Sequence, residues 1–298
     1  ENNAEISYNT NLAALAGLAN IQSIEGNLNI SYNPLLLNLS GLDSLTEVAG
    51  TLSITGNEAM LNLGGAGQLT SLAGLTVVDN PALTSLVGLG DLSQVPYGLA
   101  VFDNPGLLEL SGLGGLQTAG SLTIAGNSQL ANLTGLDSLS NVTGPVSIYD
   151  NIALDNLQGL EALTHIGGGL YLAGNSQLSS LSGLQQLNHI DDFLMIEDNP
   201  ALPTLEALDS LQSLGGNLFI TNNENLSDCA AYGICQYLAD PQGVVSVQNN
   251  EAGCQNEQEI AAACGIVSAG EVDFSPGIRF FPNPATNEII LEAEKIHE

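Results

Sequence analysis

The chain almost lacks positive charge, because it contains two Lys and Arg residues against 32 Asp and Glu residues. The two are Arg279 and Lys295, and six of the acids lie beyond Gly270, which leaves 26 acids and no Lys or Arg in residues 1–270. Such a surface cannot neutralise phosphates, so nucleic acid is excluded as a direct partner, and binding to an anionic membrane surface is not expected. Catalysis that needs Lys or Arg is excluded over the same range.

Aromatic side chains and long apolar runs are also scarce. Aromatic residues make up 4% of the chain, Trp is absent, and 34 residues are Gly, so we expect a core of aliphatic and small side chains. No window of 18 or more residues is apolar throughout, which predicts no membrane insertion. The chain begins at Glu1 rather than at Met, which we interpret as a processed or trimmed N-terminus.

Cysteine is confined to one short segment near the C-terminus. This even number of clustered cysteines favours local disulfides and an oxidising, extracytoplasmic compartment. A zinc site is the alternative, but the spacing lacks the closely spaced Cys pair that tetrahedral zinc sites usually contain. The four residues are Cys229, Cys235, Cys254 and Cys264.

The chain is rich in one repeated pattern. An Asn follows an aliphatic L-x-I segment at intervals of about 24 residues, as a solenoid repeat does. The unit has the general form N-x-x-L-x-x-L-x-G-L-x-x-L-x-x-I-x-G-x-L-x-I-x-x. The L-x-I pair has the two-residue period of a strand. The repeated residues are Asn9, Asn33, Asn57, Asn80, Asn104, Asn127, Asn151, Asn175, Asn199 and Asn223.

This repeat predicts a solenoid in which each unit is one turn of a coil with its leucines inside. Turns stacked about 4.8 Å apart would pair their L-x-I segments as a parallel sheet. We expect each repeated Asn to bond the turn backbone and its copies in neighbouring turns. We expect the Gly of each G-L step to occupy a corner that needs positive φ or a close backbone approach.

The pattern resembles leucine-rich repeats, and more closely the receptor L-domain type, a short right-handed β-helix with an Asn ladder. The resemblance covers about residues 4–250. It implies an all-β-dominated solenoid, a right-handed parallel β-helix of about ten turns of about 24 residues each, over residues 1–228. Such folds carry many binding roles, so the resemblance implies an architecture and no particular ligand.

The repeat breaks after Asn223, and residues 229–265 look like the disulfide-closed, partly helical C-terminal cap of extracellular leucine-rich-repeat proteins. Residues 229–238 have a helical pattern, and residues 244–250 read as one more strand. A second short helix is expected from Asn256, which has the spacing of an N-cap with Glu259 as its partner.

A cap is physically required, because an open solenoid end exposes apolar side chains and unpaired strand backbone. The spacing of four cysteines leaves all three pairings open. We favour Cys229–Cys254 and Cys235–Cys264, because these bonds would tie each helix to the other half of the cap.

The composition changes again after Gly265. Residues 266–278 read as a linker, and residues 279–298 resemble the start of the C-terminal sorting domain of the type IX secretion system, truncated after one strand. The resemblance implies a protein of the Bacteroidetes lineage that is exported by this machinery. A Pro-rich linker into another β-domain is the alternative. The motif residues are Pro282, Asn283, Pro284, Ala285 and Thr286.

Two sets of residues recur at equivalent positions of successive turns and raise the question of a metal. His165 and His189 are one period apart, so stacked imidazoles could share a metal, with Asp191 or Asp192 near. The same position elsewhere holds Ser, Gln or Thr, which favours a tolerant surface position.

Four Asp residues precede the repeated Asn, but one Asp per turn supplies few oxygens for calcium. We therefore interpret them as turn-forming and predict no cofactor. They are Asp79, Asp103, Asp150 and Asp198.

No catalytic motif stands out. Polysaccharide lyases also use β-helices, but they generally need a basic residue, and residues 1–278 contain no Lys or Arg. The chain has no G-x-S-x-G motif, and although a hydrolase that uses two of the many acids is an alternative, the protein is predicted not to be an enzyme.

The sheet face supplies a binding hypothesis. The residue two before each repeated Asn, and the one two before that, should point outward, and in later turns these positions hold large apolar side chains on a face of Ser, Thr and Ala. Rigid aromatics on a flat polar sheet suit stacking against sugar rings or a partner protein. The alternative is that isolated surface aromatics only cover backbone. The candidates are Phe102, Tyr149, Tyr171, Met195 and Phe219.

Three Asp-Ser-Leu triplets resemble Bacteroidetes O-glycosylation sites and should be exposed at the corners of their turns. Divergence of the repeat alone is the alternative explanation. The acceptor candidates are Ser44, Ser138 and Ser210.

Together these features predict a secreted or cell-surface, non-catalytic binding or adhesion module whose partner is an extracellular protein or glycan. A structural coat or filament subunit is one alternative. A polysaccharide-binding accessory or an extracellular carbohydrate-active enzyme is the other.

Overall fold

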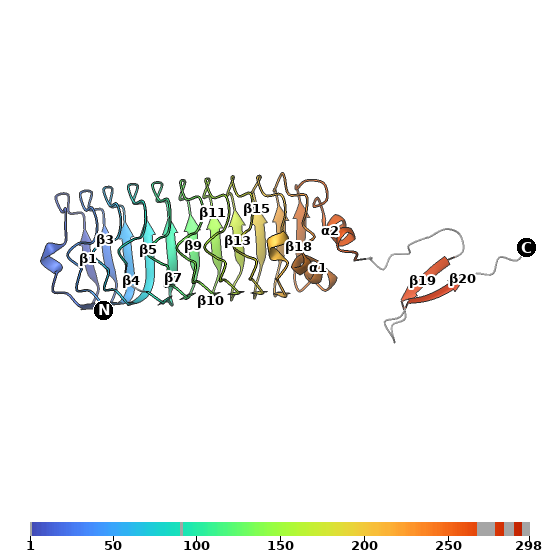
Figure 1. Ribbon diagram of the computed structural model, residues 1–298, viewed down its shortest axis with the longest axis horizontal. Helices are drawn as coiled ribbons and strands as arrows, with labels where there is room; N and C mark the ends of the chain where they lie inside the picture. The colour runs from blue at the N-terminus through green and yellow to red at the C-terminus, as the bar shows by residue number, and fades with distance from the viewer. Residues whose placement is uncertain (1, 90–91, 267–277, 283–288, 294–298) are drawn as a thin grey trace, which may run out of the picture. The chain divides into compact units, whose positions relative to one another are not determined.

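A computed structural model of the protein describes residues 2–89, 92–266, 278–282 and 289–293, the last two ranges by their backbone only. The chain divides into two compact units, Glu1–Cys264 and Gly265–Glu298. The first unit is a parallel β-solenoid of about ten turns, with few helices (Figure 1). The predicted fold class is therefore confirmed.

The L-x-I segment of each turn pairs with its equivalents in the neighbouring turns and builds a twelve-stranded parallel sheet. The order is β1-β3-β4-β5-β7-β9-β11-β13-β15-β17-β18, with β2 beside β4. The strands are β1 (Ala4–Ser7), β2 (Ser23–Ile24), β3 (Leu28–Ser31), β4 (Glu47–Thr55), β5 (Ser71–Val78), β7 (Gly98–Phe102), β9 (Leu122–Ala125), β11 (Val146–Tyr149), β13 (Leu170–Ala173), β15 (Leu194–Glu197), β17 (Leu218–Thr221) and β18 (Val245–Gln248).

A second parallel sheet forms one corner before the main sheet in six of the turns, and its order is β16-β14-β12-β10-β8-β6. Its strands contain two residues each, one outward and one inward. They are β6 (Gln94–Val95), β8 (Thr118–Ala119), β10 (Asn141–Val142), β12 (His165–Ile166), β14 (His189–Ile190) and β16 (Ser213–Leu214).

Two of the turns are one residue shorter than the others, and the corner between the sheets accommodates the difference. Val48 of β4 pairs with Leu72, a full period further along the chain, whereas Thr51 pairs with Gly74, which is one residue short of a full period. The same change of offset separates the β6–β8 pairing from the β7–β9 pairing. Because the corner takes up the missing residue, the inward side chains of the main sheet stay in phase with the core.

The interior of the solenoid is aliphatic, as the composition predicts. In the turn that begins at Asn127, every inward side chain is 0% exposed. A fully buried aliphatic side chain of this size stabilises a fold by roughly 1.5–3 kcal/mol relative to an exposed one. These side chains are Leu130, Leu133, Leu136, Leu139, Val142, Val146 and Ile148.

The repeated Asn residues form a continuous hydrogen-bonded ladder, as expected. The backbone N–H and the Nδ2 of Asn104 donate to Oδ1 of Asn127 at 3.1 and 3.3 Å, and Asn127 donates in the same way to Asn151. Nδ2 of Asn127 also donates to the carbonyl of Val101 at 2.9 Å. The ladder continues to Asn250, and its members from Asn33 to Asn223 are fully buried.

The Gly of the G-L step meets both expected requirements. Gly159 has φ +107°, and a Cβ at this position would lie 2.0 Å from the carbonyl oxygen of Leu133 in the preceding turn. Two turns differ, because their corners are 3₁₀ helices, η1 (Ala16–Leu18) and η2 (Glu206–Leu208). In η2, Ala207 stands at the position of the Gly in the G-L step, and the 3₁₀ corner accommodates its side chain.

The cap contains the two predicted helices and the predicted strand. Helix α1 (Tyr232–Ala239) begins three residues after Cys229, and β18 follows it. Helix α2 (Glu257–Ala263) begins at the expected N-cap Asn256, whose side chain accepts from the N–H of Glu259 at 3.0 Å. The carboxylate of Glu259 accepts from Gly253 and Gln255 rather than from Asn256, so the expected reciprocal bond is displaced by one residue.

Both favoured disulfides are present. Cys229 is bonded to Cys254, and Cys235 is bonded to Cys264. Cys229 lies just before α1 and Cys235 lies within it, whereas Cys254 and Cys264 lie before and after α2. The two disulfides therefore tie the two halves of the cap together.

The second unit contains an antiparallel pair of strands, β19 (Ile278–Pro282) and β20 (Ile289–Ala293). The expectation of one strand was wrong, because the residues before the proposed sorting motif also form a strand. Pro282 ends β19, whereas Asn283, Pro284, Ala285 and Thr286 lie outside the described residues. Most of the proposed linker over residues 266–278 also lies outside them.

Candidate functional site

Four of the five sheet-face candidates lie side by side. Tyr171, Met195 and Phe219 occupy paired positions of β13, β15 and β17. Tyr149 lies in β11 one turn earlier, and its ring centroid is 5.9 Å from that of Tyr171. All four side chains are half-buried on the outer face of the sheet. Phe102 is separate, because Ala125 lies between it and Tyr149 in the same register.

The structure adds Phe193, which the sequence reasoning missed. Phe193 is half-buried and precedes β15, two residues before Met195, so it faces the same way. Its ring lies against Gly169, since a Cβ on that glycine would lie 2.3 Å from the ring. Extending the two-residue period by one step would have found it. Together they form one surface, the aromatic strip, which consists of Tyr149, Tyr171, Phe193, Met195 and Phe219.

Carboxylates border the aromatic strip. Partial burial raises the pKa of Tyr171 above its ordinary value of 10.0, and the negative charges of Glu197, Asp150 and Asp198 raise it further. Glu197 accepts a hydrogen bond from Oγ1 of Thr221 at 3.3 Å. The Tyr171 phenol therefore stays protonated and able to donate at neutral pH, beside groups that only accept.

The two histidines lie in register on the second sheet, as expected. Nδ1 of His165 is 2.8 Å from Oδ1 of Asn141, and its Nε2 is 3.0 Å from Oδ2 of Asp191. Nδ1 of His189 is 3.0 Å from the hydroxyl of Ser213, and the two rings meet edge to face at 6.3 Å. Both nitrogens of His165 are thus engaged by protein groups, which favours the surface interpretation over a shared metal.

The backbone conformation explains why Asp precedes the ladder Asn in four turns. Asp79, Asp103, Asp150 and Asp198 all have φ between +53° and +56°, which is the left-handed region that Asp, Asn and Gly adopt most readily. Within the described residues, no group of three or more His, Cys, Asp and Glu side chains is placed to hold a metal. These observations support the turn-forming interpretation.

Two tyrosines occupy the same left-handed position in the first turns. Tyr8 and Tyr32 have φ +57° and +54°, and their rings stack at 5.0 Å with an interplanar angle of 17°. They are 72% and 44% exposed. A bulky residue with positive φ is a true outlier. The repeat places the two tyrosines one period apart, each directly before a ladder Asn, but their residue type does not predict this backbone conformation.

The three proposed glycosylation acceptors are less open than expected. Ser44, Ser138 and Ser210 are each half-buried, and the hydroxyl of Ser138 donates to the carbonyl of Gly114 at 2.6 Å. The Asp that precedes Ser138 accepts from the N–H of Gly135, so it also has a structural role. Glycosylation stays a prediction.

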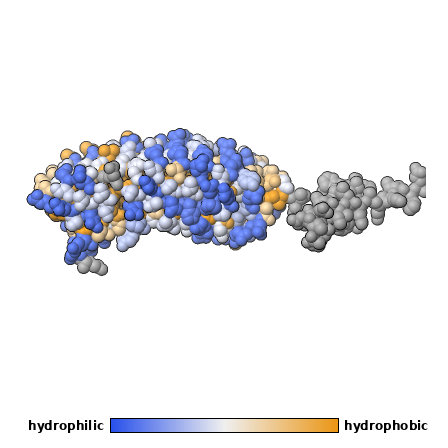
Figure 2. Space-filling view, turned by 60° about the horizontal axis from the view of Figure 1, so that its bottom comes forward, coloured by the Kyte–Doolittle hydropathy of each residue, from blue (hydrophilic) through white to orange (hydrophobic). Residues whose placement is uncertain are grey.

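Exposed aliphatic residues form a different surface on the first turns. Leu37, Leu61 and Leu108 each lie four residues after a ladder Asn and are about half exposed, at 47%, 47% and 52%. Figure 2 shows a face on which hydrophilic residues predominate and hydrophobic residues form smaller areas between them. These leucines follow the ladder Asn, whereas the aromatic strip precedes it, so the two surfaces lie on different sides of the ladder.

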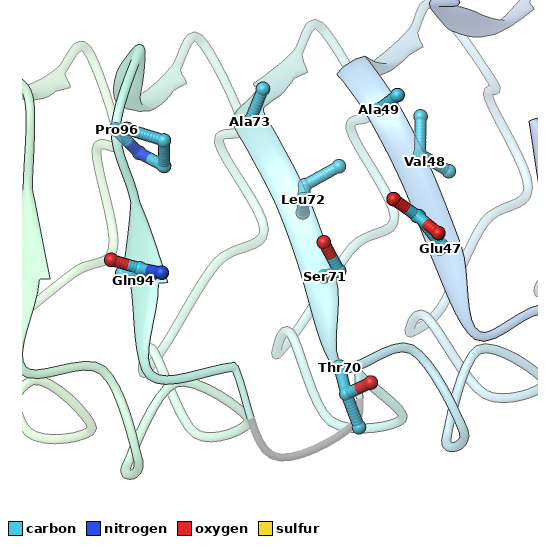
Figure 3. Close-up of a pocket in the computed structure, with 9 residues that line it drawn as sticks. All are labelled: Glu47, Val48, Ala49, Thr70, Ser71, Leu72, Ala73, Gln94 and Pro96. Atoms are coloured by element: carbon cyan, nitrogen blue, oxygen red, sulfur yellow. The ribbon is translucent and has the colours of Figure 1, made fainter. Parts of the chain in front are cut away.

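A shallow hollow of about 240 Å³ lies on the outer side of β4, β5 and β6 (Figure 3). Glu47, Ser71 and Gln94 line it together with small and aliphatic side chains. Among the described residues that line it, Glu47 is the one carboxylate, and none is His or Cys. These residues supply no pair of titratable groups of the kind that acid–base catalysis needs.

No family model matches the chain, and no curated protein matches it. Within the described residues, no helix combines the length and the hydrophobicity needed to cross a membrane.

Proposed function

We propose that the protein is a secreted or cell-surface binding module that holds its ligand on the aromatic strip without catalysing a reaction. The observation that carries this proposal is the register of β13, β15 and β17, which places Tyr171, Met195 and Phe219 at paired positions. Rigid, half-exposed aromatics on a flat sheet supply contact area with little loss of side-chain entropy on binding.

An extracellular location is part of the proposal. The two disulfides support it, because disulfides persist in oxidising compartments. The Asn ladder and the disulfide-closed cap support the resemblance to extracellular leucine-rich repeats of the receptor L-domain type. Export by the type IX machinery of a Bacteroidetes cell rests on the Pro-Asn-Pro-Ala-Thr run that follows Phe281.

The test replaces two residues of the aromatic strip. The double variant Tyr171→Ser and Phe219→Ser should fold normally, because outward side chains contribute little to the core. Its labelled form should bind at least tenfold less than wild type to the ligands that wild type selects on arrays of glycans and extracellular proteins. Circular dichroism and the Tm check the fold.

The matched control replaces two exposed tyrosines outside the aromatic strip, Tyr97 and Tyr232, which are 71% and 59% exposed. The control variant Tyr97→Ser and Tyr232→Ser should bind as wild type does. If the well-folded strip variant retains full binding, the proposed function of the strip is wrong, and the corners or the C-terminal unit would become the next surfaces to test.

A further inference from the structure

The ring of Phe193 lies over the backbone of the neighbouring turn at Gly169. A Cβ on Gly169 would lie 2.3–2.5 Å from three carbons of this ring, so the ring fits there because the residue is glycine. Tyr171 and Met195 lie in the adjacent column of the sheet. A flat apolar platform of this kind matches the C–H face of a pyranose ring, whose slightly positive hydrogens are attracted to the negative face of an aromatic ring.

Three of the polar groups around the aromatic strip are carboxylates, which only accept hydrogen bonds. Asp150 and Asp198 are exposed, and Glu197 is half-buried two residues after Met195. Carboxylates accept hydrogen bonds and cannot donate them, whereas sugar hydroxyls donate well. Hydrogen bonds to a charged acceptor are about twice as strong as those between neutral groups. The carboxylates therefore suit a ligand with many hydroxyl groups.

The charge of the site excludes anionic ligands. Residues 1–278 contain no Lys or Arg, and within the described residues no cationic side chain forms an ion pair with the three carboxylates beside the aromatic strip. A ligand that carries carboxylates or sulfates would meet like charge with nothing to neutralise it. Among polyhydroxylated ligands, this leaves neutral sugars.

The size of the aromatic strip argues for a narrow ligand. From Tyr149 to Phe219 the strip spans three steps between turns of about 4.8 Å each, or roughly 14 Å. Its width, from the column of Phe193 to the column that Tyr149 shares with Glu197, is about 13 Å. This footprint of about 200 Å² is well below the roughly 800 Å² per partner of a standard protein–protein interface. A single extended chain covers it, because the rings of such a chain follow one another at a spacing comparable to that of the turns.

We infer that the aromatic strip, with Asp150, Glu197 and Asp198 as hydroxyl acceptors, binds a neutral polysaccharide chain that lies along the solenoid axis. This inference rests on the proposed function, because it names the class of ligand for the same strip.

The experiment measures retardation of the whole protein in native gels that contain a soluble neutral polysaccharide (β-glucan, galactomannan or arabinoxylan) or an acidic one (polygalacturonate). Wild type should be retarded by at least one neutral polymer and not by polygalacturonate. Tyr171→Ser should weaken the affinity for that polymer at least tenfold.

The carboxylates are tested by exchanges that the fold already tolerates. Glu197→Gln and Asp198→Asn copy residues found in later turns at the same positions, Gln248 and Asn249. Together they should weaken the binding about tenfold, because charged acceptors are replaced by neutral amides. Asp79→Asn is the matched control, since it makes the same exchange at an equivalent backbone position far from the strip, and it should bind as wild type does.

Three results would overturn the inference. The first is retardation by none of the neutral polymers. The second is retardation that is equal for wild type and for Tyr171→Ser. The third is stronger retardation by polygalacturonate than by any neutral polymer. If the strip variants lose an extracellular protein on the arrays while no neutral polymer binds, the ligand class is wrong but the proposed function stands.

Discussion

A single amide in the middle of the Asn ladder offers the sharpest test of what holds the solenoid together. Asn127 is 0% exposed and links three turns. Its Oδ1 accepts from the backbone N–H of Asn104, and its Nδ2 donates to the carbonyl of Val101 and to Oδ1 of Asn151. We predict that Asn127→Ala strongly destabilises the protein.

The magnitude follows from the group left without a partner. In Asn127→Ala, the N–H of Asn104 loses its acceptor. The carbonyl of Val101 loses the donor of Nδ2 but stays paired in the sheet, where Val101 pairs with Ile124. Oδ1 of Asn151 keeps the backbone N–H of residue 127. A buried polar group without a partner costs about 1–3 kcal/mol, so the unpaired N–H of Asn104 should lower the free energy of unfolding by about 1–3 kcal/mol.

Asn9 supplies the matched control. It donates to Asn33 as the others do, but it lies exposed at the first rung of the ladder. Removing its side chain leaves no buried group without a partner, because its own backbone N–H still donates to Oδ1 of Asn33. Asn9→Ala should cost about 1 kcal/mol or less.

Both variants are measured by urea unfolding followed by far-UV circular dichroism, since the chain has no Trp. A loss below about 1 kcal/mol for Asn127→Ala would refute the argument that the ladder satisfies buried backbone groups. An equal loss for Asn9→Ala would also refute it, because the cost would then not depend on burial.

Reduction of the two disulfides should fray the C-terminal turns first, because the bonds close the end of a nearest-neighbour stack; unchanged hydrogen-exchange protection of residues 223–264 would contradict this. Moderate salt should raise the Tm measured at neutral pH and low ionic strength, because it screens the repulsion among 26 acids in residues 1–270, and a lower Tm in salt would contradict it. The pKa of Tyr171 is raised in the folded state, so its contribution to stability is fully present at low pH and is lost as the pH rises above about 10. Tyr171→Phe should therefore lose less stability than wild type in alkaline unfolding experiments, and an equal loss would contradict the raised pKa.

The sequence by itself determined the architecture and much of its internal bonding. In a solenoid, residues one period apart in the sequence are neighbours in space. A nearly constant period therefore predicts which residues contact each other. This is why the Asn ladder, the Gly corner and the register of Tyr171 with Met195 and Phe219 could be derived before the structure was known. The cap could also be predicted from the sequence, because an open solenoid end requires closure and all four cysteines lie in this segment.

Only the tertiary structure decided how individual side chains meet the surface. The ring of Phe193 joins the aromatic strip because Gly169 leaves room for it one turn earlier. Tyr8 and Tyr32 stack in left-handed backbone, and Ser138 turns its hydroxyl to a carbonyl of the preceding turn. A repeat specifies which positions are adjacent, but the path of the backbone at each corner specifies which way a side chain points. That path depends on packing between turns, which the period does not encode.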